Sequence, residues 1–410
     1  MIQIRQIQAA EHLAFLEEVS APGSEFPTTV SFLQTPAWAK VKPEWKPEML
    51  GFFDGSELVG VGLVLNRALP KIKRHLAYLP EGPVLDWTRN DVPEMLDALV
   101  KHCRKQGAFA VRIGPTLNHR VWHTDTIKDA IADDSVTSIA DVPADETMRE
   151  ATRLRNTLEH LRWRAPTSKE GFAAGQPMFN FQLPLVTRNE DGSVTRKSAD
   201  EVLKGMNQLF RRNIKKADKS GVTIRQGGRE DLAAFHKVYL ETAERDRFTG
   251  RPLGYFETMW DALTAENPDR MRVYLAEHEG DVVAATTWIQ VGRHAWYSYG
   301  ASTNAKREVR GSNRIQWQMI QDSIDAGAEV YDLRGITPGV RADDPEIGLI
   351  QFKVGTGGQA VAYIGEWDKP INWPLYSAFM AYMNRDKLPR PKALVAGGVS
   401  AVRGLVGGRR

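Results

Sequence analysis

The sequence predicts an α/β (α+β) protein made of two related domains, because one order of elements occurs twice along the chain. In residues 272–333 the alternation of apolar and polar side chains predicts a strand, a polar turn, two more strands, a helix and a further strand. A weaker copy of this order occupies residues 50–113. In both copies a Gly-Ala pair, at Gly107 and Gly327, ends the helix. We interpret the repeat as a duplication; chance recurrence of hairpin-plus-helix units in an α/β protein is the alternative.

Composition limits the class of protein. The chain has 410 residues, which is typical of two or three domains, and 42% of them are hydrophobic, as in soluble globular proteins. The net charge of +3 is small, so a polyanionic partner would have to bind local clusters of cations. Because Cys103 is the only cysteine, an internal disulfide and a cysteine-based zinc site are excluded. The sequence has no apolar signal region and no run of membrane-spanning length, so we expect a cytoplasmic protein.

The first copy is preceded by a strand and an amphipathic helix in residues 1–20 and by a short helix that Pro36 begins. This short helix contains Trp38, and two cations, Lys40 and Lys42, follow the tryptophan closely. Two interpretations stay open for these lysines. They are either solvated surface residues or part of a site for an anionic ligand.

The predicted boundary between the domains lies after the first copy. Residues 118–143 are polar and weakly periodic, so we predict irregular or helical structure there. A helix is expected at 152–163, and the loop at 165–175 resembles a hinge. We therefore place the first domain at residues 1–170 and begin the second at residue 171.

The clearest predicted helix begins at Ser198 and ends before Gly221. Ser198 and Glu201 have the spacing of a capping box, and Gly221 suits the left-handed position after a helix. An apolar stripe follows at helical spacing: Val202, Leu203, Met206, Leu209, Phe210, Ile214 and Ala217. The remaining faces hold five cations: Arg211, Arg212, Lys215, Lys216 and Lys219. A solvated helix face is the simplest interpretation, and contact with a phosphate backbone is the functional one.

Three later segments are also basic or rich in glycine. Arg251 precedes Pro252, which holds its backbone extended, and an arginine on a stiff loop suits recognition of phosphate or carboxylate. Residues 348–358 set Lys353 among glycines. After a predicted helix at 375–384, residues 389–410 are basic and contain no acid, which fits either a disordered end or contact with an anionic bilayer.

Several kinds of chemistry are absent from the sequence. It contains no Walker A loop, no G-x-G-x-x-G after a strand and no G-x-S-x-G elbow. The histidines show no metal-ligand spacing, so we expect no metal site. The basic and aromatic residues that remain suit an anionic substrate and a reaction assisted by positioning and charge stabilisation.

A series of segments resembles the Fem family of aminoacyl-tRNA-dependent peptidyltransferases (FemABX-like). The resemblance runs from about residue 30 to 370, and no single motif decides it. The matching segments are Ser31–Lys42, Tyr78–Asp86, the basic helix from Arg211 to Gly221, Arg245–Phe256, Tyr297–Ser302, Tyr331–Ile336, Phe352-Lys353 and Gly365–Asp368.

The resemblance implies a fold and a reaction. Members have two GNAT-like (acyl-CoA N-acyltransferase-like) domains, which here would be residues 1–170 plus 366–410 and residues 171–365. They move an amino acid from aminoacyl-tRNA to the stem peptide of a peptidoglycan precursor, either lipid II or UDP-MurNAc-pentapeptide. No cofactor is implied besides the aminoacyl-tRNA co-substrate. A monomer is expected, and peripheral contact with the inner face of the membrane is left open. The spacing between Ala217 and Ala234 leaves no room for the coiled-coil arm of some members.

The resemblance also assigns roles to residues. Phe352 and Lys353 would lie at the tRNA acceptor end and the transition-state charge. Substrate-binding candidates are Lys40, Lys42, Arg112, Arg251, Tyr297 and Tyr299, with Lys40 and Arg251 on the precursor phosphates and both tyrosines on one face of a strand. The tRNA-binding candidates are Arg211, Arg212, Lys215, Lys216 and Lys219. Arg112 matches a family arginine in an Arg-x-Asp segment, and here Gly114 replaces the aspartate. No general base is obvious; Asp332 and Glu366 are candidates.

Two other functions remain open from the sequence. An acyl-CoA N-acyltransferase would need a glycine-rich pyrophosphate loop, and in the nearest match, Arg307–Asn313, Arg310 takes the place of the first glycine. A non-catalytic module that binds RNA or a membrane surface would use the basic helix and the basic tail. It would leave Arg251 and the Phe352-Lys353 segment unexplained.

Overall fold

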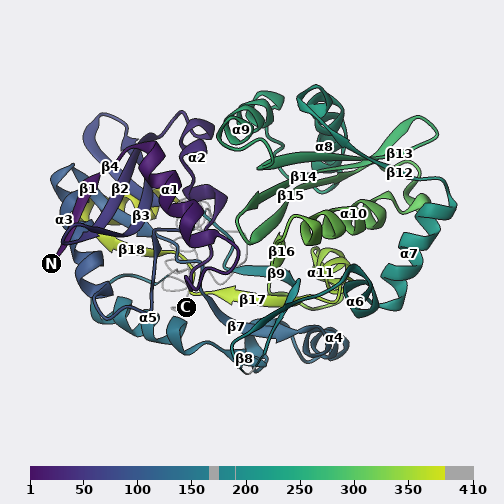
Figure 1. The fold of residues 1–410 in the computed structure, drawn as a ribbon, viewed down its shortest axis with the longest axis horizontal. Coiled ribbons are helices and arrows are strands. Elements are labelled where there is room, and N and C mark those ends of the chain that lie inside the picture. The colour runs from purple at the N-terminus through teal and green to yellow at the C-terminus, as the bar shows by residue number, and fades with distance from the viewer. Residues whose placement is uncertain (166–174, 190, 384–410) are drawn as a thin grey trace, which may run out of the picture.

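The structure, a computed structural model, describes residues 1–165, 175–189 and 191–383, and its chain forms two α/β units side by side (Figure 1). The basic tail at 389–410 lies outside the described residues. None of the helices in the described part of the chain has the length and apolar composition needed to cross a bilayer.

The first unit is built on a sheet with the strand order β1-β2-β3-β4-β6-β18, in which β5 also pairs with β3. Its strands are β1 (Ile2–Gln6), β2 (Lys46–Asp54), β3 (Glu57–Leu69), β4 (Ile72–Leu79), β5 (Val84–Leu85), β6 (Ala108–Ile113) and β18 (Trp367–Pro370). The helices around it are α1 (Ala9–Ser20), α2 (Pro36–Val41), α3 (Val92–Lys105), α5 (Arg149–His160) and α12 (Trp373–Met383). The pairing of β18 with β6 brings the chain back to the first sheet near its end.

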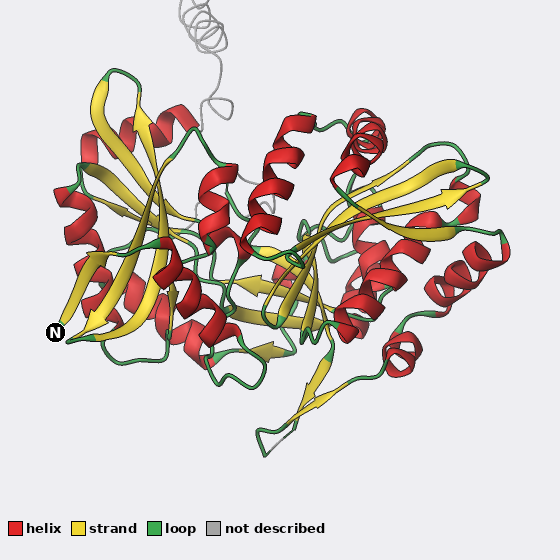
Figure 2. Cartoon of the chain, turned by 45° about the horizontal axis from the view of Figure 1, so that its top comes forward, coloured by secondary structure: helices red, strands yellow, loops and turns green. Residues whose placement is uncertain are grey.

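The second unit is built on a sheet with the order β12-β13-β14-β15-β16-β9-β17-β7-β8. Its strands are β7 (Asn118–His123), β8 (Glu146–Thr147), β9 (Phe179–Pro184), β12 (Thr223–Gly227), β13 (Met271–His278), β14 (Asp281–Val291), β15 (His294–Ser302), β16 (Val330–Gly335) and β17 (Gln359–Tyr363). Its helices are α4 (Thr124–Ala132), α6 (Ala199–Gly205), α7 (Gln208–Lys219), α8 (Leu232–Arg245), α9 (Leu253–Glu266), α10 (Gly311–Asp325) and α11 (Ile347–Val354). A small separate hairpin joins β10 (Val186–Arg188) to β11 (Val194–Arg196). Figure 2 shows the two twisted sheets with helices packed against them.

The predicted duplication is visible in the topology. In each sheet three consecutive strands pair in antiparallel fashion. The chain then passes through a helix, and the strand that follows pairs in parallel with the third. The first unit uses β2-β3-β4, then α3 and β6, and the second uses β13-β14-β15, then α10 and β16. The expected α/β fold of two related units is therefore confirmed.

Residues 118–143 differ from their prediction. They form β7 and α4, and β7 pairs with β17 in the second sheet, although this segment was expected to be irregular or helical and to lie in the first domain. The polar residues His119 and Arg120 hide the strand pattern, and pairing with β17, far away in sequence, decides the conformation.

The predicted long helix at 198–219 is two helices. The capping box of Ser198 and Glu201 is present and begins α6, but Met206 is extended and Asn207 begins α7. Asn207 accepts a hydrogen bond from Phe210 N at 2.7 Å and donates its own backbone N–H to Gly355 O at 3.0 Å. The break changes the helical phase, so that Leu209, predicted to be buried, is 53% exposed.

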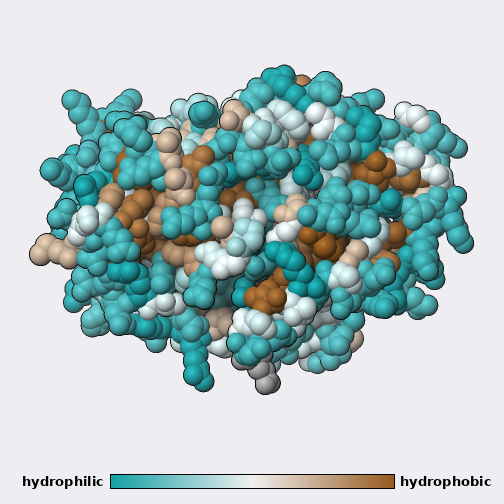
Figure 3. All heavy atoms as spheres, viewed as in Figure 1, coloured by the Kyte–Doolittle hydropathy of each residue, from teal (hydrophilic) through white to brown (hydrophobic). Residues whose placement is uncertain are grey.

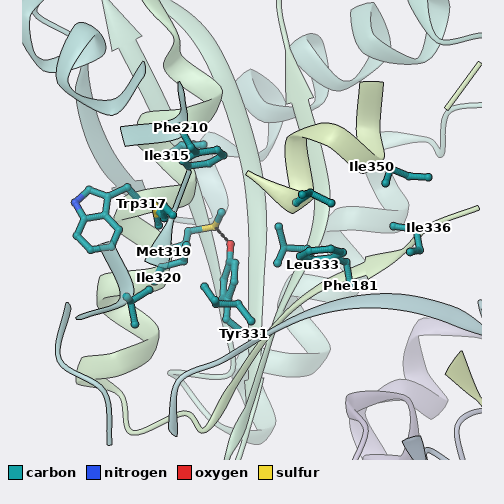
Figure 4. Packing of buried hydrophobic residues seen from close by; sticks show 14 of the residues in the cluster. Phe181, Phe210, Ile315, Trp317, Met319, Ile320, Tyr331, Leu333, Ile336 and Ile350 are labelled. Carbon is teal, nitrogen blue, oxygen red and sulfur yellow. Dashed lines mark hydrogen bonds between the residues drawn. The ribbon is translucent and has the colours of Figure 1, made fainter. Parts of the chain in front are cut away.

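The core of the second unit lies between α10 and the sheet. In Figure 4, Tyr331 of β16 lies beside Met319 of α10, and Leu333 lies beside Phe181 of β9. Tyr331 also donates a hydrogen bond to Gln316 Oε1 at 2.7 Å. Because side chains alternate along a strand, Asp332, which lies between Tyr331 and Leu333, points to the opposite side of the sheet from Tyr331. Arg334 has a left-handed φ of 63°, and its side chain reaches Glu81 of the first unit.

The surface in the view of Figure 3 is mostly hydrophilic, with hydrophobic side chains gathered in small separate patches. Exposed large apolar side chains in the described part of the chain include Ile72, Leu209 and Trp373. Single exposed apolar residues are ordinary on protein surfaces, whereas adjoining ones need an explanation.

Candidate active site between the two units

An ion pair joins the two units at the end of β16. Arg334 Nη1 donates to Glu81 Oε1 at 2.8 Å, and Arg334 Nη2 donates to Gln176 Oε1 at 3.0 Å. Glu81 lies in the turn between β4 and β5 of the first unit and also accepts from Ser31 Oγ at 2.5 Å. The side chains of Glu81 and Arg334 are 4% and 18% exposed, so the pair is largely withdrawn from water. Both residues have positive φ, of 49° and 63°, which ordinary side chains adopt at a cost.

Asp332 anchors the strand behind this ion pair. Its carboxylate is fully buried and accepts hydrogen bonds from Gln182 Nε2 at 3.1 Å and from Arg334 N at 2.6 Å, and it contacts His294 Nε2 at 3.1 Å. Burial by itself raises the pKa of Asp332, but His294 and the charge of Arg334 bring it below its usual range. An ionised carboxylate with all these contacts positions its neighbours and is poorly placed to serve as a base.

Lys353 comes from α11 and is buried at the same place. Its Nζ donates to Gly335 O at 2.7 Å and to Arg334 O at 3.3 Å, and the residue is 3% exposed. Burial lowers the pKa of Lys353 to about 7; the charge of Asp332 opposes this shift and that of Arg334 adds to it. The preceding residue, Phe352, is half-buried and packs against Phe210 of α7, with ring centroids 5.4 Å apart. The second unit thus places Lys353 beside the ion pair and Phe352 toward the basic helix.

Glu366 provides a second carboxylate near the junction. Its Oε1 accepts from Tyr78 Oη at 2.5 Å and from Gln176 N at 3.3 Å. Burial raises the pKa of Glu366, against the opposing charge of Arg112. Since Gln176 also binds Arg334, contacts run continuously from Glu366 through Gln176 and Arg334 to Lys353.

Arg112 is engaged within the first unit. It donates to both carboxylate oxygens of Asp368, at 2.7 and 2.8 Å. A Cβ at Gly114 would lie 3.4 Å from Glu366 Cγ and 3.3 Å from Glu81 N. Glu366 therefore occupies the space beside the position at which the family pattern has an aspartate.

Two cations from different units meet on one aromatic ring. Lys42, which follows α2, has its Nζ 5.2 Å from the ring centre of Tyr255, and the Cζ of Arg251, in the loop before α9, is 4.5 Å from it. Burial, together with the charge of Arg251, lowers the pKa of Lys42. Lys40 is exposed on α2, and the lysine brought to Arg251 is Lys42.

Tyr297 and Tyr299 lie on opposite faces of β15, so the expectation that they share one face was wrong. In the pairing with β14, Thr287 is opposite Tyr299 and Trp288 is opposite Tyr297, which leaves Ser298 as a bulge. A bulge shifts the alternation by one residue. Tyr297 packs toward the α10 core, and burial raises its pKa to about 12. Tyr299 faces the other side, where its hydroxyl lies 3.3 Å from that of Tyr255, close to Arg251.

The basic residues of α7 point outward. Arg212, Lys215, Lys216 and Lys219 are exposed and Arg211 is partly exposed, while Phe210, Ile214 and Ala217 are buried. The buried stripe turns the cationic face to solvent, as the helical spacing predicted. Phe210 connects this helix to Phe352.

Arg334, Glu81 and Gln176 are site residues that the sequence alone did not indicate. Arg334 was within a matched segment, Tyr331–Ile336, but nothing in the sequence tells which turn of the first unit meets it. No group of three or more His, Cys, Asp or Glu side chains suited to a metal ion occurs among the described residues.

These features define a two-unit α/β protein with a buried lysine and an ion pair at the junction of its units. The chain matches the FemAB family over residues 18–279 and 270–384, and it belongs to that family. The resemblance found in the sequence is thereby confirmed.

Among the curated relatives is the UDP-N-acetylmuramoylpentapeptide-lysine N(6)-alanyltransferase of Weissella viridescens, which is 29% identical over 347 residues, 83% of this chain and 89% of the relative. The lipid II:glycine glycyltransferase of Staphylococcus epidermidis is 23% identical over 408 residues, 84% of this chain and 89% of that protein. These relatives are transferases. The crystal structure of FemX matches 92% of this chain and 99% of its own, with a TM-score of 0.73 and 22% identity, in agreement with the fold.

Proposed function

We propose that this protein transfers an amino acid from aminoacyl-tRNA to an amine of the stem peptide of a peptidoglycan precursor. The observation that carries the proposal is the position of Lys353, buried at the junction of the units and linked to Glu366 through Arg334 and Gln176. Membership of a family whose curated relatives are alanyl- and glycyltransferases acting on such precursors supports it.

The reaction needs little beyond positioning and charge stabilisation. The amine of the stem peptide attacks the carbonyl carbon of the aminoacyl ester, a C–N bond forms, and the C–O bond to the tRNA ribose breaks. Negative charge develops on the carbonyl oxygen, and the ammonium form of Lys353 would stabilise it. A lysine with a pKa of about 7 is partly protonated at neutral pH and can also return a proton to the leaving ribose oxygen.

Glu366 is the better of the two carboxylates to take the proton of the attacking amine. Its pKa is raised by burial, which suits a group that must accept a proton. Asp332 is less suited because its oxygens already accept hydrogen bonds from Gln182 and Arg334. Tyr78, bound to Glu366, would fix the orientation of the carboxylate.

The pair of Lys42 and Arg251 is a candidate site for the pyrophosphate that lipid-linked and UDP-linked precursors share. Lys42 and Arg251 lie on one aromatic ring, and burial together with the charge of Arg251 lowers the pKa of Lys42, so a bound anion would offset the repulsion between the two cations. Tyr255 and Tyr299 line the same cluster. Lys40 is better assigned to the rim of this site because it is exposed.

The exposed cations of α7 are candidates for the tRNA. Their helix contacts Phe352, next to Lys353, so an RNA backbone along α7 would bring its acceptor end toward the buried lysine. Backbone contacts of this kind are electrostatic and weaken with salt.

The test is transfer of labelled amino acids from a charged total-tRNA pool to lipid II and to UDP-MurNAc-pentapeptide, with and without ribonuclease. We expect ribonuclease-sensitive label on one of the acceptors and a loss of at least about a hundredfold in kcat for Lys353→Met, since one oxyanion-stabilising group contributes about this much. Lys197→Met is the control, because Lys197 is a partly buried lysine that, like Lys353, donates to a backbone carbonyl, here Pro184 O at 3.0 Å.

Lys42→Met and Arg251→Met should mainly raise KM for the precursor, while Lys215→Glu/Lys216→Glu should raise KM for the tRNA. Transfer of label that persists in the presence of ribonuclease would contradict the proposal, and so would full transfer activity of Lys353→Met. Transfer from acetyl-CoA to a small amine, without transfer from tRNA, would support the acyl-CoA-dependent alternative instead.

A further inference from the structure

Helix α12 is unusually apolar for a helix at the surface of this protein. Residues 370–384 contain no charged side chain, and α12 itself includes Trp373, Leu375, Phe379 and Met380. A helix of this composition ordinarily lies buried on all sides.

Only one side of α12 is covered by the sheet. Tyr376 is buried, and Leu375, Phe379 and Met380 pack against a small cluster formed by Leu76 and Phe109. The rings of Phe109 and Phe379 are 5.5 Å apart. The opposite side, which includes Ser377, Ala378 and Ala381, is exposed. Large apolar side chains are exposed at the two ends of the helix, where Trp373 is 49% exposed and Met383 is 40% exposed.

A cationic hairpin adjoins this helix. Leu69, at the end of β3, packs into the same cluster as Phe379. The residues around the β3–β4 turn are exposed, and they comprise Arg67, Lys71, Ile72, Lys73 and Arg74. Ile72 is 46% exposed at the tip, and residues 58–80 contain no acidic residue. At the other end of the helix the guanidinium of Arg164 lies 4.5 Å from the ring of Trp373.

We propose that α12 and the β3–β4 hairpin form a docking face for an anionic bilayer surface. Exposed Trp and aliphatic side chains beside cations, without acids, match the acyl and headgroup layers of such a bilayer. Lys and Arg side chains close to an anionic bilayer are attracted to it, and the cations of this hairpin together suffice for reversible binding. A protein partner would need acids to match these cations and is less well suited to the tryptophan and aliphatic side chains.

The face also adjoins the candidate active site. Tyr78 packs into the α12 cluster and donates its hydroxyl to Glu366. A bilayer on this face would lie close to the end of the site where the acceptor amine is activated. Resting on the proposed function, this face therefore selects the lipid-linked precursor as the acceptor class, in preference to the soluble UDP-linked one.

The experiment is co-sedimentation of the full chain with vesicles of phosphatidylglycerol and phosphatidylcholine, and with phosphatidylcholine alone. We expect binding to the anionic vesicles only. The affinity for these vesicles should fall at least about tenfold in Lys71→Glu/Lys73→Glu/Arg74→Glu, because three side chains that the anionic surface attracts are replaced by three that it repels. Trp373→Gln should weaken binding to the anionic vesicles as well. The control Lys215→Glu/Lys216→Glu/Lys219→Glu makes the same change in net charge on α7 and should leave vesicle binding within about twofold, because screening limits the effect of distant charges.

Equal losses in the hairpin variant and the α7 control would show a general charge effect and overturn the proposal. So would the absence of binding, or binding unchanged in the hairpin variant, which would point to another part of the chain such as residues 384–410. In parallel, the hairpin variant should lose transfer to lipid II in vesicles but keep transfer to the UDP-linked acceptor. If the native chain transfers to neither acceptor and still binds vesicles through this hairpin, the proposed function fails while the docking face stands.

Discussion

At the scale of single residues, the most consequential side chain is Lys353. Burial brings its pKa to about 7 from an ordinary value of 10.5. The unfolded chain would hold this proton up to about pH 10.5, whereas the folded protein releases it near pH 7. Over that window the unfolded state binds more protons, so the free energy of unfolding rises with pH.

This shift gives a prediction for stability. Between pH 6.5 and 9, the native protein should gain about 2–3 kcal/mol relative to Lys353→Met, at a slope of up to about 1.4 kcal/mol per pH unit. Urea unfolding at a series of pH values measures it. The exposed Lys40→Met is the control and should follow the native curve. A difference that stays constant, or falls with pH, would mean that Lys353 keeps its charge when buried.

The ion pair of Glu81 and Arg334 is the second prediction at this scale. Arg334→Met leaves the Glu81 carboxylate buried without its cation and should cost about 3–5 kcal/mol. The double variant Arg334→Met/Glu81→Gln removes the uncompensated charge and should recover part of this loss. Denaturant unfolding of both single variants and the double variant completes the cycle. Losses that simply add would indicate that the two side chains do not interact.

At the scale of elements, the break between α6 and α7 fixes the basic helix relative to α11. Asn207 caps α7 through Phe210 N and holds Gly355 O through its backbone. Asn207→Ala should therefore cost about 1 kcal/mol, the usual value of such a cap. Leu209→Ala, on the same helix but half-exposed, should change stability by less than about 0.5 kcal/mol. Thermal unfolding compares the two, and equal effects would show that the cap contributes nothing.

The elements also show what sequence can and cannot predict. Periodicity predicted the strands and the helix between residues 272 and 333, which the structure contains as β13, β14, β15, α10 and β16, because strands and helices that face a core have a regular pattern. The capping box at Ser198 was found because its signal is local. The bulge at Ser298 and strand β7 were missed because each depends on a neighbouring strand distant in sequence.

The same distinction holds for the candidate site. Phe352, Lys353 and Arg251 were identified from matched segments, and the structure brings Lys353 to the junction of the units. The choice of Lys42 over Lys40 depends on which side of a short helix meets the other unit, which spacing alone leaves open. Arg334 and Glu81 are separated by 253 residues, so only the packing of the two units reveals them as partners.

At the scale of the whole molecule, the two units share a hydrophobic core. One cluster contains Val61 and Trp38 from the first unit together with Phe256 and Trp296 from the second. Phe32 lies between them, with its ring 5.2 Å from Trp38 and 5.1 Å from Trp296. Domains that meet through polar surfaces move relative to one another, whereas a shared apolar core couples them.

We therefore expect both units to unfold together. Phe52 is fully buried within the first unit, and Phe52→Ala should cost about 3–5 kcal/mol through the cavity it leaves. If the units are coupled, this substitution shifts the entire denaturation curve, and tryptophan fluorescence and far-UV circular dichroism remain coincident. If the units are independent, the first unit unfolds early with only part of the signal, and the two probes separate. Coupling would hold Glu81 and Arg334, and hence Lys353, in one fixed arrangement, so the site would be formed before either substrate binds.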